Sequence, residues 1–356
     1  MNTNTQTLHQ LGQRLWLDNI SRPLLTSGTL ARYIADLSVT GLTSNPTIFE
    51  QAIAASGAYD EDIRRHAALG ESDEGIFFEL ALDDLKQAAD LFRPMFDVSD
   101  GRDGWVSLEV SPLLAHDAQG TIRAAASLHA SAARPNLFIK IPGTAEGIVA
   151  IEQSIFAGIP INVTLLFSPE QYLFSAAAYM VGLERRLAAG MNVAVESVAS
   201  LFVSRWDVAV KDRTAVTFHN RLGIAIAMLT YRAHRELLAS DRWQKLAAAG
   251  ARPQRLLWAS TGTKDPAAPD TLYIDALAAA DTINTIPEKT LLAYADHGAA
   301  SATLPADGGY AENVLEEFRR EGIADEALAV QLQTEGVAAF AKSWRGLMTR
   351  IAEKRL

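Results

Sequence analysis

The sequence has no cysteine among its 356 residues. This absence excludes disulfide bonds, thiolate metal sites and cysteine nucleophiles, and it leaves the redox compartment open. The chain also lacks an uninterrupted apolar run of about 18 residues, which a membrane-spanning helix would need. The stretch MNTNTQTLHQ at residues 1–10 has neither the basic nor the apolar segment of a signal peptide. We therefore expect a soluble, cytoplasmic protein that does not associate with membranes.

Clusters of basic residues are missing as well. The chain has 32 lysines and arginines against 42 aspartates and glutamates, which gives a formal charge of -10. Nucleic acids and anionic membranes are therefore poor partners, because their binding sites concentrate positive charge. The seven histidines show neither H-x-H nor H-E-x-x-H spacing, so no metal site is expected. An anionic small substrate would need a local basic site within this acidic chain.

The sequence does contain a repeated alternation of short apolar runs and stretches with helical periodicity. The predicted strands are residues 14–20, 37–46, 105–110, 137–141, 159–167, 192–205, 255–261 and 281–287. Helical stretches are predicted near 26–35, over 75–96, 118–133, 144–157 and 169–188, and twice within 208–250. Eight such units indicate an α/β fold in which a parallel sheet closes into a (β/α)8 TIM barrel. The alternative is an open doubly wound sheet, but no G-x-G-x-x-G follows the first strand and no P-loop is present.

Residues 287–356 exceed a minimal barrel and are mostly helical in periodicity. We interpret them as additional C-terminal helices that form an appended cap, with 322–356 supplying two helices. No repeat, low-complexity tract or long linker divides the chain, so a single domain over 1–356 is expected. The outer helices could be solvated or could form a subunit interface, which leaves a homodimer as an open alternative.

Lys140 lies in the middle of the predicted strand NLFIKIPG, residues 136–143, where desolvation makes an ammonium group costly. The structural explanation is a salt bridge at a barrel end, or a charge that protects an edge strand. The functional explanation is a nucleophilic amine, because burial lowers the pKa of an amine and about 7 to 8 suits a nucleophile. Such an amine attacks a carbonyl to form a Schiff base, which serves as an electron sink for C–C bond cleavage.

Other polar residues occur inside or just after the predicted strands, where a barrel enzyme places its catalytic groups. They are Asp18, Thr43, Asn45, Glu109, Asn162, Thr164, Ser200, Arg205 and Ser260. Taken singly, each has a structural explanation, such as a turn, a helix cap, or a buried ion pair between Glu109 and Lys140. Taken together they favour function, because a polar ring inside a barrel is costly unless it is used.

Three of these residue types suit the proton transfers of Schiff-base chemistry. Glu109 and a water held by Thr164 could move the protons that carbinolamine formation and dehydration require. Asp18 could accept a proton from a substrate hydroxyl as the C–C bond breaks. Asp18 and Glu109 could also share or exchange these roles.

The remaining polar residues suit substrate binding. Asn45 and Asn162 could orient hydroxyl groups without adding charge. Arg205, together with Ser200 and Ser260, would form an anion site, most naturally for a phosphate.

Five motifs resemble the transaldolase family. They are TGLTSNPTIFE (40–50), SLEVSPLLAHD (107–117), NLFIKIPGTAEGIVAIEQ (136–153), PINVTLLFSPEQY (160–172) and SVASLFVSRWD (197–207). The stretch DTINTIPEKTLLAYADHG (281–298) resembles the C-terminal signature of the longer bacterial members. The resemblance implies a barrel enzyme that transfers a dihydroxyacetone unit from sedoheptulose 7-phosphate to glyceraldehyde 3-phosphate, with no metal or organic cofactor. Its products would be erythrose 4-phosphate and fructose 6-phosphate, in the non-oxidative pentose phosphate pathway.

The same resemblance assigns roles to individual residues. It makes Lys140 the Schiff-base lysine, Asp18 the acid/base aspartate, and Glu109 a glutamate that works through a water on Thr164. The residues that it implies for substrate binding are Thr43, Asn45, Asn162, Ser200 and Arg205. Phe202 takes the position where related fructose-6-phosphate aldolases tend to carry a tyrosine, which favours transfer over simple aldol cleavage.

The sequence departs from the family pattern after the seventh predicted strand, in ASTGTKD at 259–265. Shorter members carry a second phosphate-binding arginine there, at the place of Gly262, and Lys264 is the expected substitute. Two other functions remain as alternatives. One is a fructose-6-phosphate-type aldolase that releases free dihydroxyacetone, and the other is a catalytically inactive barrel that binds sugar phosphates.

Overall fold

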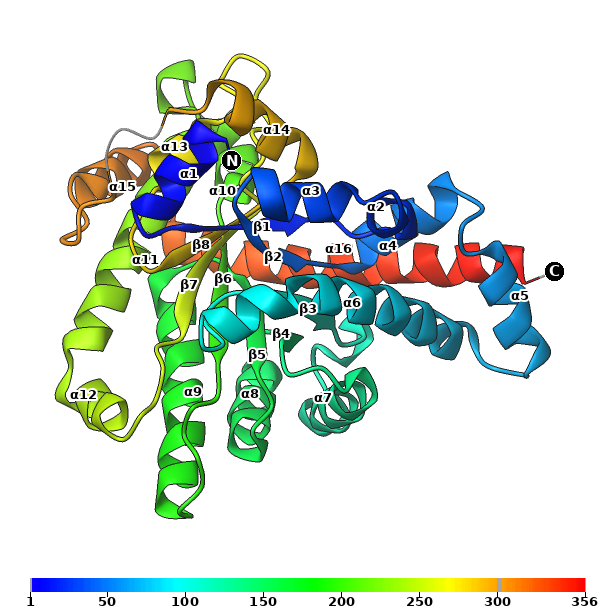
Figure 1. Cartoon of the computed structure of the whole chain (residues 1–356). Helices are drawn as coiled ribbons and strands as arrows, with labels where there is room; N and C mark the ends of the chain where they lie inside the picture. Colours follow the sequence, from blue (N-terminus) through cyan, green and yellow to red (C-terminus); the bar gives the residue numbers. More distant parts are fainter. Residues whose placement is uncertain (1, 300–302, 356) are drawn as a thin grey trace.

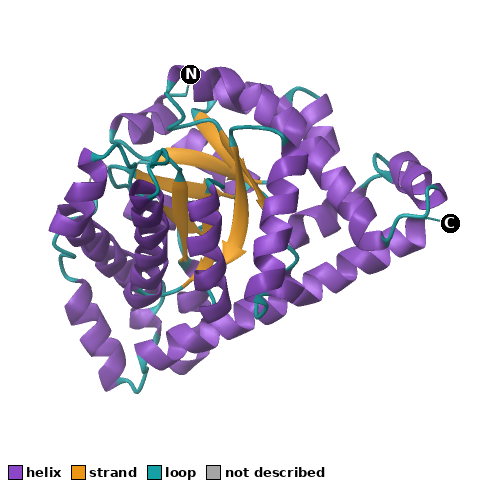
Figure 2. Cartoon of the chain, turned by 90° about the horizontal axis from the view of Figure 1, so that it is seen from below, coloured by secondary structure: helices purple, strands orange, loops and turns teal. Residues whose placement is uncertain are grey.

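A computed structural model, described for residues 2–299 and 303–355, shows eight parallel strands that close into a barrel in chain order. Figure 2 shows the strands enclosed by helices. The barrel closes where β1 pairs with β8, with Arg14 opposite Ile283. The strands are β1 (Arg14–Asp18), β2 (Val39–Thr43), β3 (Trp105–Glu109), β4 (Leu137–Pro142), β5 (Ile161–Leu166), β6 (Ser197–Phe202), β7 (Arg255–Ala259) and β8 (Thr282–Ile286). The predicted (β/α)8 fold is therefore confirmed.

Helices connect the strands and cover the outside of the barrel (Figure 1). Before β5 they are α1 (Thr3–Gln10), α2 (Arg22–Thr26), α3 (Thr29–Asp36), α4 (Pro46–Ala55), α5 (Asp60–Ala68), α6 (Asp73–Val98), α7 (Ala118–Ala132) and α8 (Ala145–Ala157). After β5 they are α9 (Pro169–Ala188), α10 (Ser204–Val210), α11 (Leu222–Ala239), α12 (Asp241–Ala248), α13 (Leu272–Ala276), α14 (Glu288–His297), α15 (Ala311–Arg320) and α16 (Asp325–Lys354). Among the described residues, no helix has the length and apolar character needed to cross a membrane.

Two details of the predicted elements differ from the structure. The strand expected over 192–205 is limited to β6, because α10 already begins at Ser204. The expectation of two helices within 322–356 is wrong, since α16 is one continuous helix of 30 residues. Gly336 does not interrupt this helix. A Cβ there would lie 2.9 Å from Leu165 Cδ2 and 3.2 Å from Arg205 Nη1, so the glycine permits close packing on the barrel.

Buried aromatic side chains of β1, β3 and β4 pack together on the amino-terminal side of the polar residues. The rings of Trp105 and Phe138 stack with centroids 4.0 Å apart, and Trp16 lies 6.1 Å from Phe138. A Cβ on Gly41 would lie 2.6 Å from the Trp105 carbonyl oxygen and 2.7 Å from Trp16 Nε1. Only glycine fits this position, because the two tryptophans leave no room for a side chain.

The polar residues come later on the same strands. Asp18, Thr43 and Lys140 each follow an aromatic or glycine position by two residues, so they share its face of the sheet. In the strand register Glu109 lies opposite Lys140, and Lys140 lies opposite Asn162. The apolar layer therefore supports a polar layer at the carboxyl ends of the strands.

Helix α16 packs on this polar end and runs outward to α5 (Figure 1). Gln333 Nε2 donates one hydrogen bond to the carbonyl oxygen of Gly143, directly after β4 (3.0 Å), and another to that of Leu165, within β5 (2.9 Å). Farther along, Lys354 Nζ donates to Asp60 Oδ1 at 2.7 Å. These contacts fix the position of α16 relative to the mouth of the barrel.

Candidate active site

A pocket of about 380 Å³ opens at the carboxyl ends of the strands. Ten of the twelve residues predicted for the site line it: Asp18, Thr43, Asn45, Lys140, Thr164, Ser200, Phe202, Arg205, Ser260 and Lys264. The other two, Glu109 and Asn162, are buried and contact lining residues. The structure therefore brings together side chains that are separated by up to 246 positions in the chain.

Lys140 is 5% exposed, and its amine reaches the pocket from β4. Nζ donates a hydrogen bond to the Ser44 carbonyl oxygen at 3.2 Å and lies 3.5 Å from Glu109 Oε2. The ion pair considered from the sequence is therefore present. It does not remove the amine from the pocket, so the structural and functional explanations of Lys140 are compatible.

Glu109 is also 5% exposed, and burial raises the pKa of its carboxyl group to about 7. The positive charge of Lys140 opposes this rise, and the negative charge of Asp18 adds to it. Among the described residues, Glu109 Oε2 and the buried hydroxyl of Thr164 have no hydrogen-bond partner. A carboxyl group with a pKa near neutrality can both give and accept a proton.

Asp18 ends β1 and is held by Thr43, which is in turn hydrogen-bonded to Thr285. Thr43 Oγ1 donates to Asp18 Oδ1 at 2.9 Å, and Thr43 and Thr285 share a hydrogen bond of 2.6 Å. Because the Thr43 hydrogen is directed to Asp18, Thr285 is the donor in the second bond. Burial raises the pKa of Asp18, while Lys140 and the bond from Thr43 oppose the rise.

The side-chain oxygens of Asn45 and Asn162 each accept a hydrogen bond that fixes the side chain. Asn45 Oδ1 accepts a hydrogen bond from Ile48 N and caps α4, as a side-chain oxygen at this position commonly does. Asn162 Oδ1 accepts from Ser200 Oγ at 2.7 Å, and its Nδ2 donates to Ser107 Oγ at 3.1 Å. Asn162 therefore reaches the pocket through Ser200.

Arg205 lies half-buried at the start of α10, where the negative charge of Glu335 partly opposes the effect of burial on its pKa. Its Cζ atom is 5.1 Å from the ring centroid of Phe202 and 5.8 Å from that of Phe340. Within residues 2–299 and 303–355 its guanidinium forms no ion pair, and burial lowers its pKa. Burying a cation is costly, so a bound anion would stabilise this site.

Lys264 and Ser260 complete the same side of the pocket. Lys264 lies close enough to Asp18 for its charge to lower the pKa of that carboxyl group. It forms no ion pair with any described residue. Ser260 has a φ of 56°, an unusual left-handed conformation, and its hydroxyl shares a hydrogen bond with Ser204 Oγ at 2.9 Å. Gly262, where the family pattern has an arginine, lines the pocket as well.

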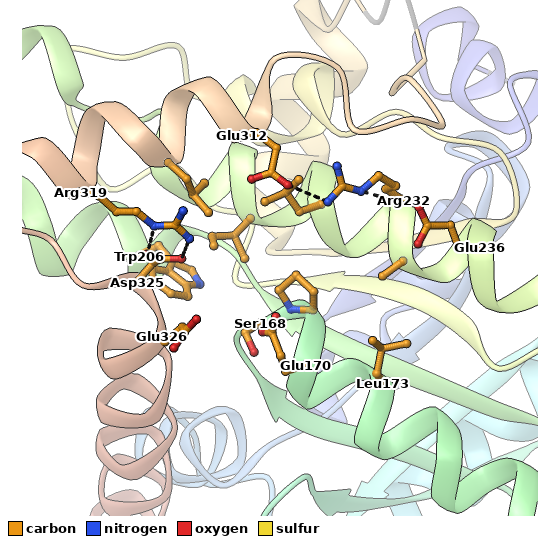
Figure 3. A pocket seen from close by; sticks show the side chains of 15 residues that line it. Ser168, Glu170, Leu173, Trp206, Arg232, Glu236, Glu312, Arg319, Asp325 and Glu326 are labelled. Carbon is orange, nitrogen blue, oxygen red and sulfur yellow. Dashed lines mark hydrogen bonds and ion pairs between the residues drawn. The ribbon is translucent and has the colours of Figure 1, made fainter.

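A second cavity lies between α9, α11, α15 and the start of α16 (Figure 3). Its arginines are already paired: Arg232 binds Glu312 at 2.8 Å, and Arg319 binds Asp325 through two hydrogen bonds. None of the predicted site residues lines this cavity. The free cations of the barrel pocket therefore make it the better site for an anionic substrate.

Several residues that line the pocket were not predicted from the sequence. They are Thr47, Ile48, Gln51, Ala259, Gly262, Thr285, Pro287 and Phe340. Thr285 could have been found, because it lies at the end of β8 two residues after Ile283, as Asp18 lies after Trp16. Phe340 gave no such signal, since it belongs to a helix far along the chain. Among the described residues, no group of three or more His, Asp or Glu could hold a metal ion.

Comparison with known proteins agrees with this geometry. The model of the family described as "Transaldolase/Fructose-6-phosphate aldolase" matches residues 15–351. The chain belongs to this family. A "Transaldolase" of Thermobifida fusca is 44% identical over 363 residues, covering 99% of both chains. A "Transaldolase" of Saccharopolyspora erythraea is 43% identical, covering 99% of this chain and 98% of the relative. "Transaldolase 1" of Streptomyces avermitilis is 44% identical and covers 98% and 95%. The transaldolase family predicted from the motifs is confirmed.

Proposed function

We propose that this chain is a transaldolase that moves a dihydroxyacetone unit from sedoheptulose 7-phosphate to glyceraldehyde 3-phosphate. Erythrose 4-phosphate and fructose 6-phosphate are the products. The observation that carries the proposal is the position of the Lys140 amine in the pocket, 3.5 Å from a carboxyl group whose pKa is about 7. Full-length relatives named transaldolase support it.

The first half of the reaction builds the imine. The Lys140 amine adds to the ketone carbon of the donor, and the resulting carbinolamine loses water. Glu109 supplies and accepts the protons, because it is partly protonated at neutral pH. The buried hydroxyl of Thr164, which has no hydrogen-bond partner among the described residues, is suited to hold a water that carries these protons.

The second half breaks and remakes a C–C bond. Asp18 accepts the proton of a donor hydroxyl, the bond breaks, and its electron pair moves into the imine to form an enamine as the aldose leaves. The enamine carbon then adds to the acceptor aldehyde, whose oxygen takes the proton back from Asp18. Water finally adds across the C=N bond, which releases the new ketose and restores the amine.

Substrate binding follows from the remaining side chains. Arg205 and Lys264, with Ser260, are suited to the phosphate, because neither cation forms an ion pair with a described residue. Asn45, and Asn162 through Ser200, are suited to orienting hydroxyl groups.

The second candidate is a fructose-6-phosphate-type aldolase, which belongs to the same family by name. It would release dihydroxyacetone without an acceptor. Phe202, which lines the pocket, favours transfer. Coupled assays with and without an aldehyde acceptor separate the two activities. The single domain over 1–356 with its 287–356 cap, the homodimer and the cytoplasmic location stay predictions.

Borohydride reduction in the presence of fructose 6-phosphate tests the proposal. We expect a reduced three-carbon adduct on Lys140, identified by intact mass and peptide mapping, and none in Lys140→Ala. The variant should fold, because removing a buried amine is not strongly destabilising when Glu109 can take up a proton. An adduct on another lysine would retain the chemistry and move the site. Ligand binding without any adduct would support the inactive barrel.

A further inference from the structure

Phe340 of α16 brings an aromatic ring over the reacting groups. The Lys140 Nζ atom lies 5.9 Å from the ring centroid, and the Arg205 Cζ atom lies 5.8 Å from it. Its centroid is also 6.4 Å from that of Phe202, with the rings at 63°. One side chain from outside the barrel thus contacts the region of both the amine and the proposed phosphate site.

The helix that carries Phe340 is fixed on both sides of it. Gln333, seven residues before, donates to two carbonyl oxygens at the ends of β4 and β5. Ser343, three residues after, accepts a hydrogen bond of 2.8 Å from Thr47 Oγ1, and Thr47 itself lines the pocket. Phe340 is 6% exposed, so its ring is packed in place rather than free in solvent.

We propose that Phe340 is a specificity-determining residue, whose ring keeps water from the enamine carbon so that the dihydroxyacetone unit is transferred rather than released. The proposal rests on the transaldolase activity proposed above. It adds to the role of Phe202, because Phe340 approaches the pocket from α16 and not from a strand.

The chemistry explains why water must be kept from the enamine carbon. After the aldose leaves, the three-carbon unit remains on Lys140 as an enamine. If its nucleophilic carbon gains a proton, an imine of dihydroxyacetone forms, and water can then add across the C=N bond. The C–N bond breaks, free dihydroxyacetone leaves and the amine is restored. An apolar ring disfavours the first of these steps, because it excludes the water that would deliver a proton to the enamine carbon. Hydrolysis of the C=N bond also completes normal transfer, so protonation of the enamine carbon is the step that separates release from transfer.

A purely structural role would give a different result. Phe340 packs against Phe202, so its removal could simply loosen α16. Loosening would lower stability and overall rate, but it would not selectively change the fate of the enamine. The informative quantity is therefore the ratio of released dihydroxyacetone to transferred product.

The experiment uses the full chain with fructose 6-phosphate as donor and erythrose 4-phosphate as acceptor. Phe340→Ala should raise the ratio of release to transfer by roughly tenfold, which corresponds to about 1.4 kcal/mol in relative barriers. Without acceptor, the borohydride-trappable adduct should also be shorter-lived. Phe340→Val is the second variant should the alanine variant not fold, and its ratio should also exceed that of the wild type.

Leu347→Ala is the matched control, because Leu347 is a fully buried residue of α16 that does not line the pocket. It should lower the melting temperature and leave the ratio unchanged. Wild-type transfer with an unchanged ratio in the folded Phe340 variants would overturn the inference alone, as would an equal rise in Leu347→Ala. Absence of both adduct and transfer in the wild type would instead overturn the proposed function, and the inference with it.

Discussion

Replacing Glu109 with glutamine should remove a pH-dependent cost of folding. The carboxyl group is 5% exposed, and burial raises its pKa from an ordinary value of 4.5 to about 7. Between these two values the unfolded chain has an ionised Glu109, whereas the folded protein keeps the proton. The folded state therefore binds more protons, and its stability falls as the pH rises. Glutamine has a similar shape and cannot titrate.

The size of the effect follows from the difference in pKa. Each unit corresponds to about 1.4 kcal/mol, so the full rise from 4.5 to about 7 is worth about 3 kcal/mol. Well below pH 4.5 both states hold the proton, and the stability of the folded protein is not reduced by Glu109. The stability is lost as the pH rises, and the loss is complete above about 7. Titrating groups that do not interact with Glu109 are common to both proteins, so their effect cancels in the comparison.

Denaturant unfolding of wild type and Glu109→Gln, from about pH 5 to about pH 8, measures this difference. The free energy of unfolding of the variant, minus that of the wild type, should increase by about 2–3 kcal/mol over this range. A difference that stays constant with pH would refute the raised pKa. It would also remove the argument that Glu109 can both give and accept protons near neutrality.

Three further substitutions test the substrate site and the position of α16. Arg205→Ala should raise KM for phosphorylated donors by roughly 10- to 100-fold with a smaller effect on kcat, because the phosphate loses its half-buried partner. Steady-state kinetics with fructose 6-phosphate and with fructose check this, and equal losses for both donors would place the phosphate elsewhere. Lys264→Ala should raise the same KM less, since Lys264 is exposed, and a larger rise would reverse their order of importance. Gln333→Leu should lower the free energy of unfolding by about 1–3 kcal/mol, because the carbonyls of Gly143 and Leu165 lose their donor; unfolding curves identical to the wild type would contradict this.

The barrel could be predicted from the sequence because its strands are short apolar runs with fixed periodicity. In β4 every residue is buried, including Lys140, and the apolar neighbours identify the strand despite the charge. The start of β6 was less predictable. Val193 and Val195 continue the apolar pattern, but their backbones bond to each other instead of to a neighbouring strand. Hydrophobicity alone does not distinguish these two arrangements.

The residues of the candidate site also fall into a predictable and an unpredictable group. Residues on strands could be predicted, because the carboxyl ends of all eight strands meet at one face. Phe340 could not, since periodicity identifies the apolar face of α16 but not the surface that this face covers. Gly336 shows the same limit. Its effect on the helix depends on Leu165 and Arg205, which are distant in the chain.

The pairing of β1 with β8 has a consequence for the order in which the protein is made. A ribosome delivers the chain from its N-terminus, so β1 must wait for β8 before the barrel can close. Helix α16, which carries the Phe340 ring, is synthesised later still. Lys140 is thus present in the nascent chain well before the groups that would protect its chemistry, and a partly made chain has no enclosed pocket in which to form a lasting adduct.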